Sequence, residues 1–368
     1  MYLFTNILAG ILLVVLSFEP GMKYREKYHV DLSINPSIPV VATSDGFLFC
    51  SKGDNKFPTK MVLLSADTDI VWEKSIAYPA SAVSESQGGA CVLDDRGNFY
   101  SIDAAGSVTD YLAGIVLPGR NVMAKSLSGM FYASGSDNSL TCFYSDGNIE
   151  WMIETESTPT HIYPIDEDII VSSSSGSLVR YTTEGAVVWT VDAKGFTILN
   201  PIQDNEGNLV YALRNSTGSS GLLTIVQPDG TIGRQTSLQF APVSFYLFDT
   251  GYILVGKYDA AFVGNTGEVE WFKKIDPAAK MIYQLGVDYP DNVVLGFHYD
   301  YQTEGIISIK TMDLAGNLTD ICQFTIDEGK NPKLSMIGRD LLIGIDNTIT
   351  IYELMTMKEY IDRLNRKN

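Results

Sequence analysis

The sequence predicts an all-β protein, a single eight-bladed β-propeller made of four-stranded antiparallel blades. Three observations lead to this fold class. A pattern of turn residues repeats through most of the chain, every tryptophan occupies the same position of that repeat, and a strand near the N-terminus is available to complete the last blade. A repeat of this length is typical of a four-stranded propeller blade.

Seven turn residues mark the repeat: Thr68, Gly106, Gly147, Gly185, Gly230, Gly267 and Gly316. They are separated by 38, 41, 38, 45, 37 and 49 residues, a mean of about 41, which lies in the range of one blade. Glycine supplies the positive φ that hairpin turns need. We therefore expect each turn to join two short antiparallel strands.

The residues around each turn also recur. The fourth residue before the turn is always apolar: Leu64, Ile102, Phe143, Tyr181, Val226, Val263 and Met312. The second residue after it is always aliphatic: Ile70, Val108, Ile149, Val187, Ile232, Val269 and Leu318. The fourth residue after it holds all four tryptophans, Trp72, Trp151, Trp189 and Trp271, with Asp110, Arg234 and Asp320 in the other units. Because side chains alternate along a strand, we expect the aliphatic residue and the tryptophan to share one buried face of the outermost strand.

The tryptophans at this position are predicted to be structural. A tryptophan on the outermost strand can fill the gap between neighbouring blades and donate its N–H to a backbone carbonyl. The alternative is an aromatic stack around a cofactor. A peripheral strand lies far from the central channel where a ligand would bind, which favours the structural role.

The other strands of a blade lie before each turn. In the fourth unit we predict strands at His161–Ile165, Asp168–Ser173 and Ser177–Thr182, followed by Val187–Val191 after the turn. Four strands therefore make one blade.

The last blade is short of one strand. Three strands are predicted at Lys333–Gly338, Leu341–Ile345 and Thr348–Glu353, and none follows them. One mean period before Thr68, a turn is expected near residue 27, with a strand at Tyr28–Ser33 after it. This strand can complete the eighth blade and remove the free sheet edges. If it stays outside the ring, the count is seven blades.

Residues 1–21 are predicted to be a signal peptide or an N-terminal membrane anchor. The apolar run Ile7–Leu16 has the length of a signal h-region, and Val15 and Ser17 suit the −3 and −1 positions of a cleavage after Ser17. No basic residue precedes the run and three follow it, so an uncleaved anchor, or translation from Met22, stays open. We expect an extracytoplasmic protein, periplasmic or secreted.

The propeller is expected to span residues 24–353, and a short amphipathic helix is expected in residues 354–368. Met357, Tyr360, Ile361 and Leu364 follow the i, i+3, i+4, i+7 spacing of one helix face. This helix is expected either to cap the propeller or to dock a partner.

Charge and cysteine content exclude several classes of function. With 26 Lys and Arg against 44 Asp and Glu, the net charge of −18 repels phosphate backbones and anionic headgroups. We therefore predict no nucleic-acid binding, and membrane contact only through the N-terminal segment. The four cysteines, Cys50, Cys91, Cys142 and Cys322, are far apart in strand-like stretches and are predicted to be buried free thiols.

A family resemblance follows from the turn motifs. Asp146-Gly147 with Trp151, Glu184-Gly185 with Trp189, and Asn265-Thr266-Gly267 with Trp271 resemble the pyrroloquinoline-quinone-like (PQQ-like) repeat, across roughly residues 28–353. No Trp-Asp pair ends a strand, so the chain does not resemble the WD-dipeptide propellers. The resemblance implies one of two functions: a quinone-dependent dehydrogenase, or a non-catalytic envelope scaffold such as the BamB-type subunits of outer-membrane assembly.

The residues do not support catalysis. The resemblance implies that a quinone enzyme would use a vicinal disulfide and a calcium site, but no two cysteines are adjacent. Asp204–Gly207 lacks the spacing of a calcium loop and is predicted to be a hairpin turn. His29, His161 and His298 fall in separate predicted strands, as packing or surface histidines do. We predict no catalytic, cofactor-binding or metal-binding residues, and hence no enzyme.

The connections between second and third strands favour a protein-binding scaffold in the cell envelope. Those of blades one, five and seven are long, at Lys52–Lys60, Asn215–Gly221 and His298–Glu304. Insertions on one face often mark a binding surface. The partner-binding candidates are Tyr299, Asp300 and Tyr301, an aromatic and acidic group typical of interfaces. The alternative is a sensor that binds a small molecule or a glycan in the propeller channel.

Overall fold

The computed structural model describes residues 23–31, 36–43, 46–51, 58–65, 69–86, 89–119, 121–166, 168–193, 195–199, 201–288, 292–301, 304–337, 339–346, 348–355 and 359. Its elements are 33 β-strands, which form eight antiparallel sheets of four strands. In the fifth sheet the first strand is divided into two short pieces. The predicted fold class, an eight-bladed β-propeller, is confirmed.

The larger of two compact units comprises Val30–Asp276 and Asp346–Thr348 and contains blades one to six. Blades one to three are β2 (Pro36–Thr43), β3 (Gly46–Ser51), β4 (Thr59–Ser65) and β5 (Ile70–Ile76); β6 (Ala80–Ser86), β7 (Gly89–Asp94), β8 (Phe99–Ile102) and β9 (Val108–Leu112); and β10 (Val122–Lys125), β11 (Phe131–Ser134), β12 (Ser139–Phe143) and β13 (Ile149–Glu154).

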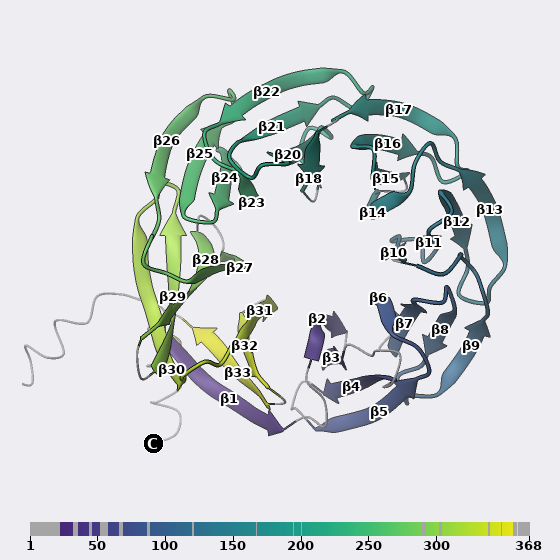
Figure 1. Ribbon diagram of the computed structural model, residues 1–368, viewed down its shortest axis with the longest axis horizontal. Coiled ribbons are helices and arrows are strands. Elements are labelled where there is room, and N and C mark those ends of the chain that lie inside the picture. The colour runs from purple at the N-terminus through teal and green to yellow at the C-terminus, as the bar shows by residue number, and fades with distance from the viewer. Residues whose placement is uncertain are drawn as a thin grey trace, which may run out of the picture. The chain divides into compact units, whose positions relative to one another are not determined.

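Blades four to six are β14 (Pro159–Ile165), β15 (Asp168–Ser173), β16 (Ser177–Tyr181) and β17 (Val187–Asp192); β18 (Phe196–Ile198) with β19 (Ile202–Gln203), β20 (Leu209–Asn215), β21 (Gly221–Val226) and β22 (Ile232–Leu238); and β23 (Pro242–Phe248), β24 (Gly251–Gly256), β25 (Asp259–Gly264) and β26 (Val269–Lys274). Within this unit the first strands lie on the inner side of the arc of blades and the fourth strands on its periphery (Figure 1).

The smaller unit comprises Met1–His29, Pro277–Ile345 and Ile349–Asn368. Its first sheet is blade seven: β27 (Met281–Asp288), β28 (Asn292–Asp300), β29 (Glu304–Asp313) and β30 (Leu318–Asp327). Its second sheet is blade eight: β31 (Lys333–Ile337), β32 (Asp340–Ile345), β33 (Thr348–Met355) and β1 (Lys23–Asp31).

An N-terminal strand does complete the last blade, because β1 is hydrogen-bonded to β33. Its position differs from the expectation. The strand runs over Lys23–Asp31 instead of Tyr28–Ser33, and residue 27, where a turn was expected, lies inside it. The earlier start suits its partner, because β33 is eight residues long and offers an extended ladder to pair with. A six-residue strand would leave part of that edge open.

The predicted turn glycines have the expected conformation. From Gly106 to Gly316 the six glycines have φ between 74° and 88°. In blade two, the N–H of Gly106 donates to the carbonyl of Asp103 over 3.0 Å, and Asp103 N–H donates to Ser107 over 2.9 Å. The Asp103 carboxylate accepts hydrogen bonds from the N–H groups of Ala105 and Ser107. These bonds fix a tight turn in which the glycine occupies the left-handed region.

In blades three, four and five, the residue at the tryptophan position donates a hydrogen bond to the following blade. Trp151 Nε1 in blade three donates to the carbonyl of Thr183 in blade four over 2.6 Å. In blade five the same position is occupied by Arg234, whose Nη1 donates to the carbonyl of Asn265 in blade six. Each acceptor lies two residues before the turn glycine of the following blade. An arginine at this position therefore makes the same contact as a tryptophan, whereas the buried Nε1 of Trp72 has no hydrogen-bond partner among the described residues.

The turn glycines have a second role that the sequence did not show. A Cβ atom added to Gly230 would lie 2.5 Å from the Cβ of Trp189, and one added to Gly106 would lie 2.7 Å from Cγ of Trp72. Trp72 and Trp189 are each 7% exposed and belong to clusters of buried side chains from two successive blades. The glycine leaves room for the preceding blade's side chain to approach the turn backbone.

The predicted burial of the aliphatic residues two after the turn is wrong. In blades one to six these side chains are 39% to 59% exposed: Ile70, Val108, Ile149, Val187, Ile232 and Val269. The reason is a β-bulge. Arg180 and Tyr181 are adjacent on the third strand, but their partners Trp189 and Val187 are two residues apart on the fourth strand. The fourth strand therefore contains one extra residue at this point. The bulge turns the tryptophan inward and the aliphatic residue outward, and it recurs in all six of these blades.

Two predicted segments lie outside the described residues. Residues 1–21, the predicted signal peptide or anchor, are among them, as are residues 356–358 and 360–368 of the predicted C-terminal helix. Strand β33 continues to Met355, two residues beyond the expected end of the propeller. In the part of the chain that the structure describes, no helix is long and apolar enough to span a membrane.

Candidate functional site

Connections between second and third strands all leave a blade at the same edge, which we call the 2–3 edge. Two of the three predicted long connections can be assessed, since residues 52–57 lie outside the described ranges. The blade-five connection, Asn215–Gly221, is stabilised by hydrogen bonds within it. The Asn215 carboxamide accepts hydrogen bonds from the N–H groups of Ser219 and Ser220 and donates to both of their hydroxyls. Its polar groups are largely satisfied internally, so it offers few of them to a partner.

The predicted connection at His298–Glu304 is much shorter than expected. Strand β28 continues to Asp300 and β29 starts at Glu304. Tyr299 is paired with Ile306, and Asp300 with Gly305. The additional pairs include Tyr299 with Ile306, and aromatic and β-branched side chains favour such a ladder. The candidates Tyr299 and Asp300 therefore lie on a rigid strand end, and Tyr301 follows them.

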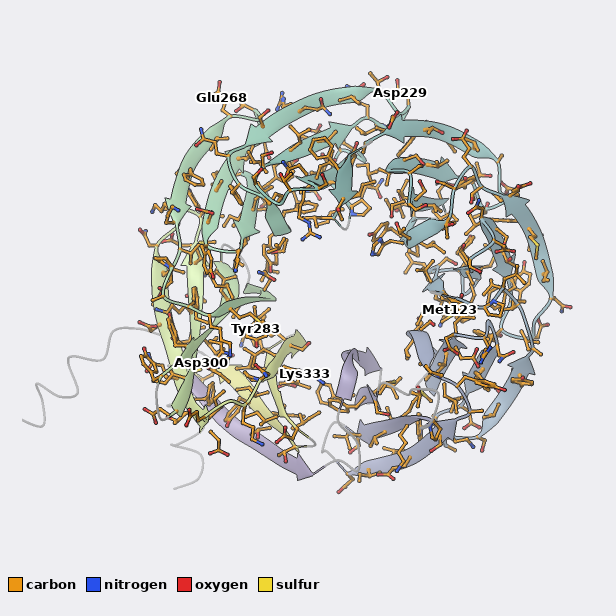
Figure 2. The ribbon with its side chains drawn as sticks, in the orientation of Figure 1. Met123, Asp229, Glu268, Tyr283, Asp300 and Lys333 are labelled. Atoms are coloured by element: carbon orange, nitrogen blue, oxygen red, sulfur yellow. The ribbon has the colours of Figure 1, made fainter. Side chains whose placement is uncertain are left out.

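Tyr299, Asp300 and Tyr301 are brought together at the 2–3 edge of blade seven. The Tyr299 ring stacks between two others: its centroid is 6.4 Å from that of Phe297 and 6.5 Å from that of Tyr301. Phe297 is fully buried, whereas Tyr301 is 54% exposed. The aromatic row thus runs from the core of the blade to its surface, where Asp300 is also exposed. Figure 2 labels Asp300 in blade seven.

The charges beside Tyr301 form a small network. Asp300 forms an ion pair with Lys280, and its Oδ1 lies 3.0 Å from Nε2 of His298. The hydrogen bond from Lys280 lowers the pKa of the Asp300 carboxyl below its ordinary value. His298 is 1% exposed, and burial lowers its pKa from 6.5, although the Asp300 carboxylate acts in the opposite direction. Apart from this contact, Nε2 has no described polar partner.

A hollow of about 360 Å³ lies between blades five and six. Asp204, Glu206 and Asp249 line it together with Arg234. The Asp204 carboxylate accepts hydrogen bonds from the N–H groups of Glu206 and Asn208 and from the Asn208 carboxamide. These bonds confirm the predicted hairpin turn, and they use the carboxylate within the turn itself. The Arg234 guanidinium is also engaged within the protein, because it donates a hydrogen bond to the Asn265 carbonyl in the next blade.

A larger hollow of about 580 Å³ lies between blades four and five, at their inner strands and near the 2–3 edge. Its polar lining comes from Thr160 and His161 on β14, the serines at the end of β15, and Arg214 on β20. None of these residues except His161 was singled out from the sequence. The signal in the sequence is the run Ser172–Ser175, in which four hydroxyls span the end of β15 and the turn after it.

The histidines and cysteines lie where they were predicted. His29, His161 and His298 belong to strands β1, β14 and β28. Among the described residues, no three His, Cys, Asp or Glu side chains are grouped to hold a metal ion. All four cysteines are buried thiols that form no disulfide. Burial raises the pKa of Cys50 and Cys322 to about 12.

Comparison with known proteins shows the fold. No family model and no curated protein matches the sequence. Among solved structures, BamB from Moraxella catarrhalis is similar with a TM-score of 0.64 and 13% identity, over 90% of this chain and 97% of that one. The C-terminal WD40 domain of Sif2 has a TM-score of 0.65 and 11% identity, over 90% and 98%.

The same comparison includes an enzyme. A streptogramin B lyase is similar with a TM-score of 0.50 and 14% identity, over 92% of this chain and all of that one. At these identities the likeness concerns the arrangement of strands alone. Propellers of this kind occur both as protein-binding modules and as enzymes.

Proposed function

We propose that this protein is an exported, non-catalytic PQQ-like propeller that binds protein partners in the cell envelope. The observation that carries the proposal is the exposed end of the aromatic row in blade seven, where Tyr301 is 54% exposed and lies next to Asp300. Tyrosine side chains held in place by stacking lose little conformational entropy on binding, and they are enriched at the centres of protein interfaces.

The rigidity of this surface supports binding. Tyr299 is fixed by a ladder pair with Ile306 and by stacking on Phe297. The ion pair between Asp300 and Lys280 fixes the neighbouring carboxylate. A surface whose residues are already ordered binds a partner at a lower entropic cost. Tyr299, Asp300 and Tyr301 are therefore proposed as the contact residues.

The envelope location in this proposal is supported by the N-terminal sequence and by the resemblance of the turn motifs to PQQ-like repeats. The apolar run Ile7–Leu16 has the length of a signal h-region. Intact mass measurement of the protein from its native cells, after separation of cell compartments, tests this part. A mature chain that begins at Phe18 in an extracytoplasmic fraction is expected, and full-length protein in the cytoplasm would contradict export.

The binding proposal is tested by cross-linking in the native cell, followed by purification of the tagged protein and mass spectrometry. We expect envelope proteins to be recovered with the wild type and to be lost with Tyr301→Ala. The matched control is Tyr144→Ala, which removes a tyrosine of 42% exposure from a turn in blade three. Recovery of the protein alone, or equal recovery with Tyr301→Ala, would contradict the proposal.

A further inference from the structure

The hollow between blades four and five has a lining unlike the rest of the surface. Most of its lining comes from β14 and β15 of blade four and from β18 and β20 of blade five, with Val122 of β10 in blade three. It measures about 580 Å³. A volume of this size is in the range of sites for small organic ligands. All of these strands belong to the larger compact unit. The hollow is therefore formed by neighbouring blades of one unit.

Its walls carry an ordered set of hydroxyl groups. The Thr160 and Ser172 hydroxyl oxygens are 3.0 Å apart, and Ser172 Oγ lies 3.4 Å from Nδ1 of His161. Ser172 is 1% exposed, so its hydroxyl is held in position. Ser173 and Ser174 extend the polar wall toward the turn. Hydroxyl groups both donate and accept hydrogen bonds, as do the hydroxyls of a sugar.

The charge of the hollow is opposite to that of the protein. The chain has a net charge of −18, yet the described residues that line this hollow include no Asp or Glu. Its ionisable lining residues are Arg214 and His161, which are cationic when charged. Arg214 is half-buried, and its guanidinium forms no hydrogen bond or ion pair with another described residue. A half-buried guanidinium without a partner is suited to a carboxylate or phosphate, which it binds through two parallel hydrogen bonds.

An apolar wall completes the hollow. Phe196 and Ile198 line one side from β18. On the other side lies the ring of His161. It is stacked on Tyr163, which lies outside the lining, with centroids 5.9 Å apart and planes inclined by 12°. Flat aromatic surfaces pack against the apolar C–H faces of a sugar ring, while the hydroxyls around the ring bond to polar side chains.

We infer that this hollow binds an anionic sugar, whose acidic group pairs with Arg214 and whose hydroxyls bond to Thr160, His161 and Ser172. The inference goes beyond partner binding at blade seven and does not depend on it. The acidic group can be a carboxylate or a phosphate, since both match the guanidinium. The selectivity for an anion comes from Arg214, and the selectivity for a sugar comes from the hydroxyl and aromatic walls.

Isothermal titration calorimetry of the full chain tests this inference. The probes are D-glucuronate, glucose 6-phosphate, neutral glucose, sodium acetate and inorganic phosphate. We expect one of the two sugar anions to bind at least about tenfold more tightly than glucose and than the matching simple anion. The better of the two sugars identifies the acidic group.

Two variants assign the binding to the hollow. Arg214→Gln is expected to weaken the sugar anion at least about tenfold, because it removes the charged hydrogen bonds. Lys257→Gln is the matched control, since it removes one positive charge from an exposed position at the 2–3 edge of blade six. Circular dichroism and the urea midpoint confirm that both variants are folded.

The inference is overturned if neither sugar anion binds the wild type, or if Arg214→Gln binds it as tightly as the wild type does. Equal affinity for glucose would refute the role of charge. Equal affinity for acetate or inorganic phosphate would refute recognition of the sugar.

Discussion

The indole Nε1 of Trp189 in blade four donates a hydrogen bond to the carbonyl oxygen of Pro228 in blade five over 3.2 Å. The same indole packs against the turn backbone at Gly230. One side chain therefore joins the outermost strand of its blade to the third-to-fourth strand turn of the next. This contact explains why the glycine and the tryptophan recur together in the sequence.

Replacement of Trp189 by alanine is expected to lower the free energy of unfolding by about 3–5 kcal/mol, as for other buried aromatic residues. The control is Val187→Ala on the same strand, where the side chain is 59% exposed and about 0.5 kcal/mol or less is expected. Urea unfolding followed by circular dichroism measures the unfolding free energy of both variants. Tryptophan fluorescence gives a second measurement for Val187→Ala, which keeps all four tryptophans. An unchanged Trp189→Ala midpoint would refute the inter-blade contact.

Gly230→Ala is expected to destabilise the protein more than Gly129→Ala does. Both glycines have φ near +90°, so each alanine incurs a conformational cost of about 1–2 kcal/mol. At Gly129 no atom lies within 4 Å of the added Cβ, whereas at Gly230 the Cβ of Trp189 lies 2.5 Å away. Thermal unfolding of the two variants separates backbone conformation from the inter-blade contact. Equal melting temperatures would show that the close approach contributes nothing.

The cysteines are expected to resist thiol reagents while the protein is folded. The pKa of Cys50 and Cys322 is raised to about 12 by burial, so both are protonated thiols at pH 8 and carry little reactive thiolate. Ellman's reagent should label all four cysteines in urea and almost none in buffer. Rapid labelling of the native protein at pH 8 would contradict the burial of these strands.

His298 is expected to titrate below pH 6.5 in the folded protein, because burial lowers its pKa. In the unfolded chain the ordinary pKa of about 6.5 applies. The unfolded state therefore binds more protons as the pH falls below 6.5, and stability decreases until the pH reaches the lower folded pKa. Well above pH 6.5, His298 is neutral in both the folded and the unfolded state, so it does not make the stability depend on pH.

NMR titration measures this pKa directly, because the chain has three histidines and His298→Gln identifies the resonance. The same variant should lose the pH dependence of stability that His298 causes. Asp300→Asn should lower the His298 pKa further, since the carboxylate opposes the effect of burial. A His298 pKa above 6.5 would show that the carboxylate outweighs burial.

Much of the fold could be predicted from the sequence, because the turn glycines and tryptophans repeat with the blade. The three predicted strands Asp168–Ser173, Ser177–Thr182 and Val187–Val191 agree with β15, β16 and β17 to within one residue. The burial of the aliphatic residues was predicted wrongly, because a bulge between Val187 and Trp189 leaves no mark in the alternation of residue types.

The candidate sites were less predictable. Tyr299, Asp300 and Tyr301 are adjacent in sequence, so their proximity could be predicted. The extension of β28 and β29 into the expected connection could not. The hollow between blades four and five joins Thr160 and Ser172 to Arg214, which is 54 and 42 residues further along the chain. Local pattern carries no information about contacts between residues that far apart.

Position-resolved photo-cross-linking tests the proposed scaffold function most directly. A benzophenone amino acid at Tyr301 probes the 2–3 edge of blade seven, and one at Ala315, in the turn between β29 and β30, probes the opposite edge of the same blade. Irradiation of native cells should give a discrete adduct with an envelope protein from position 301 and none from position 315. Adducts absent from both positions, or equal at both, would contradict a specific partner at this surface.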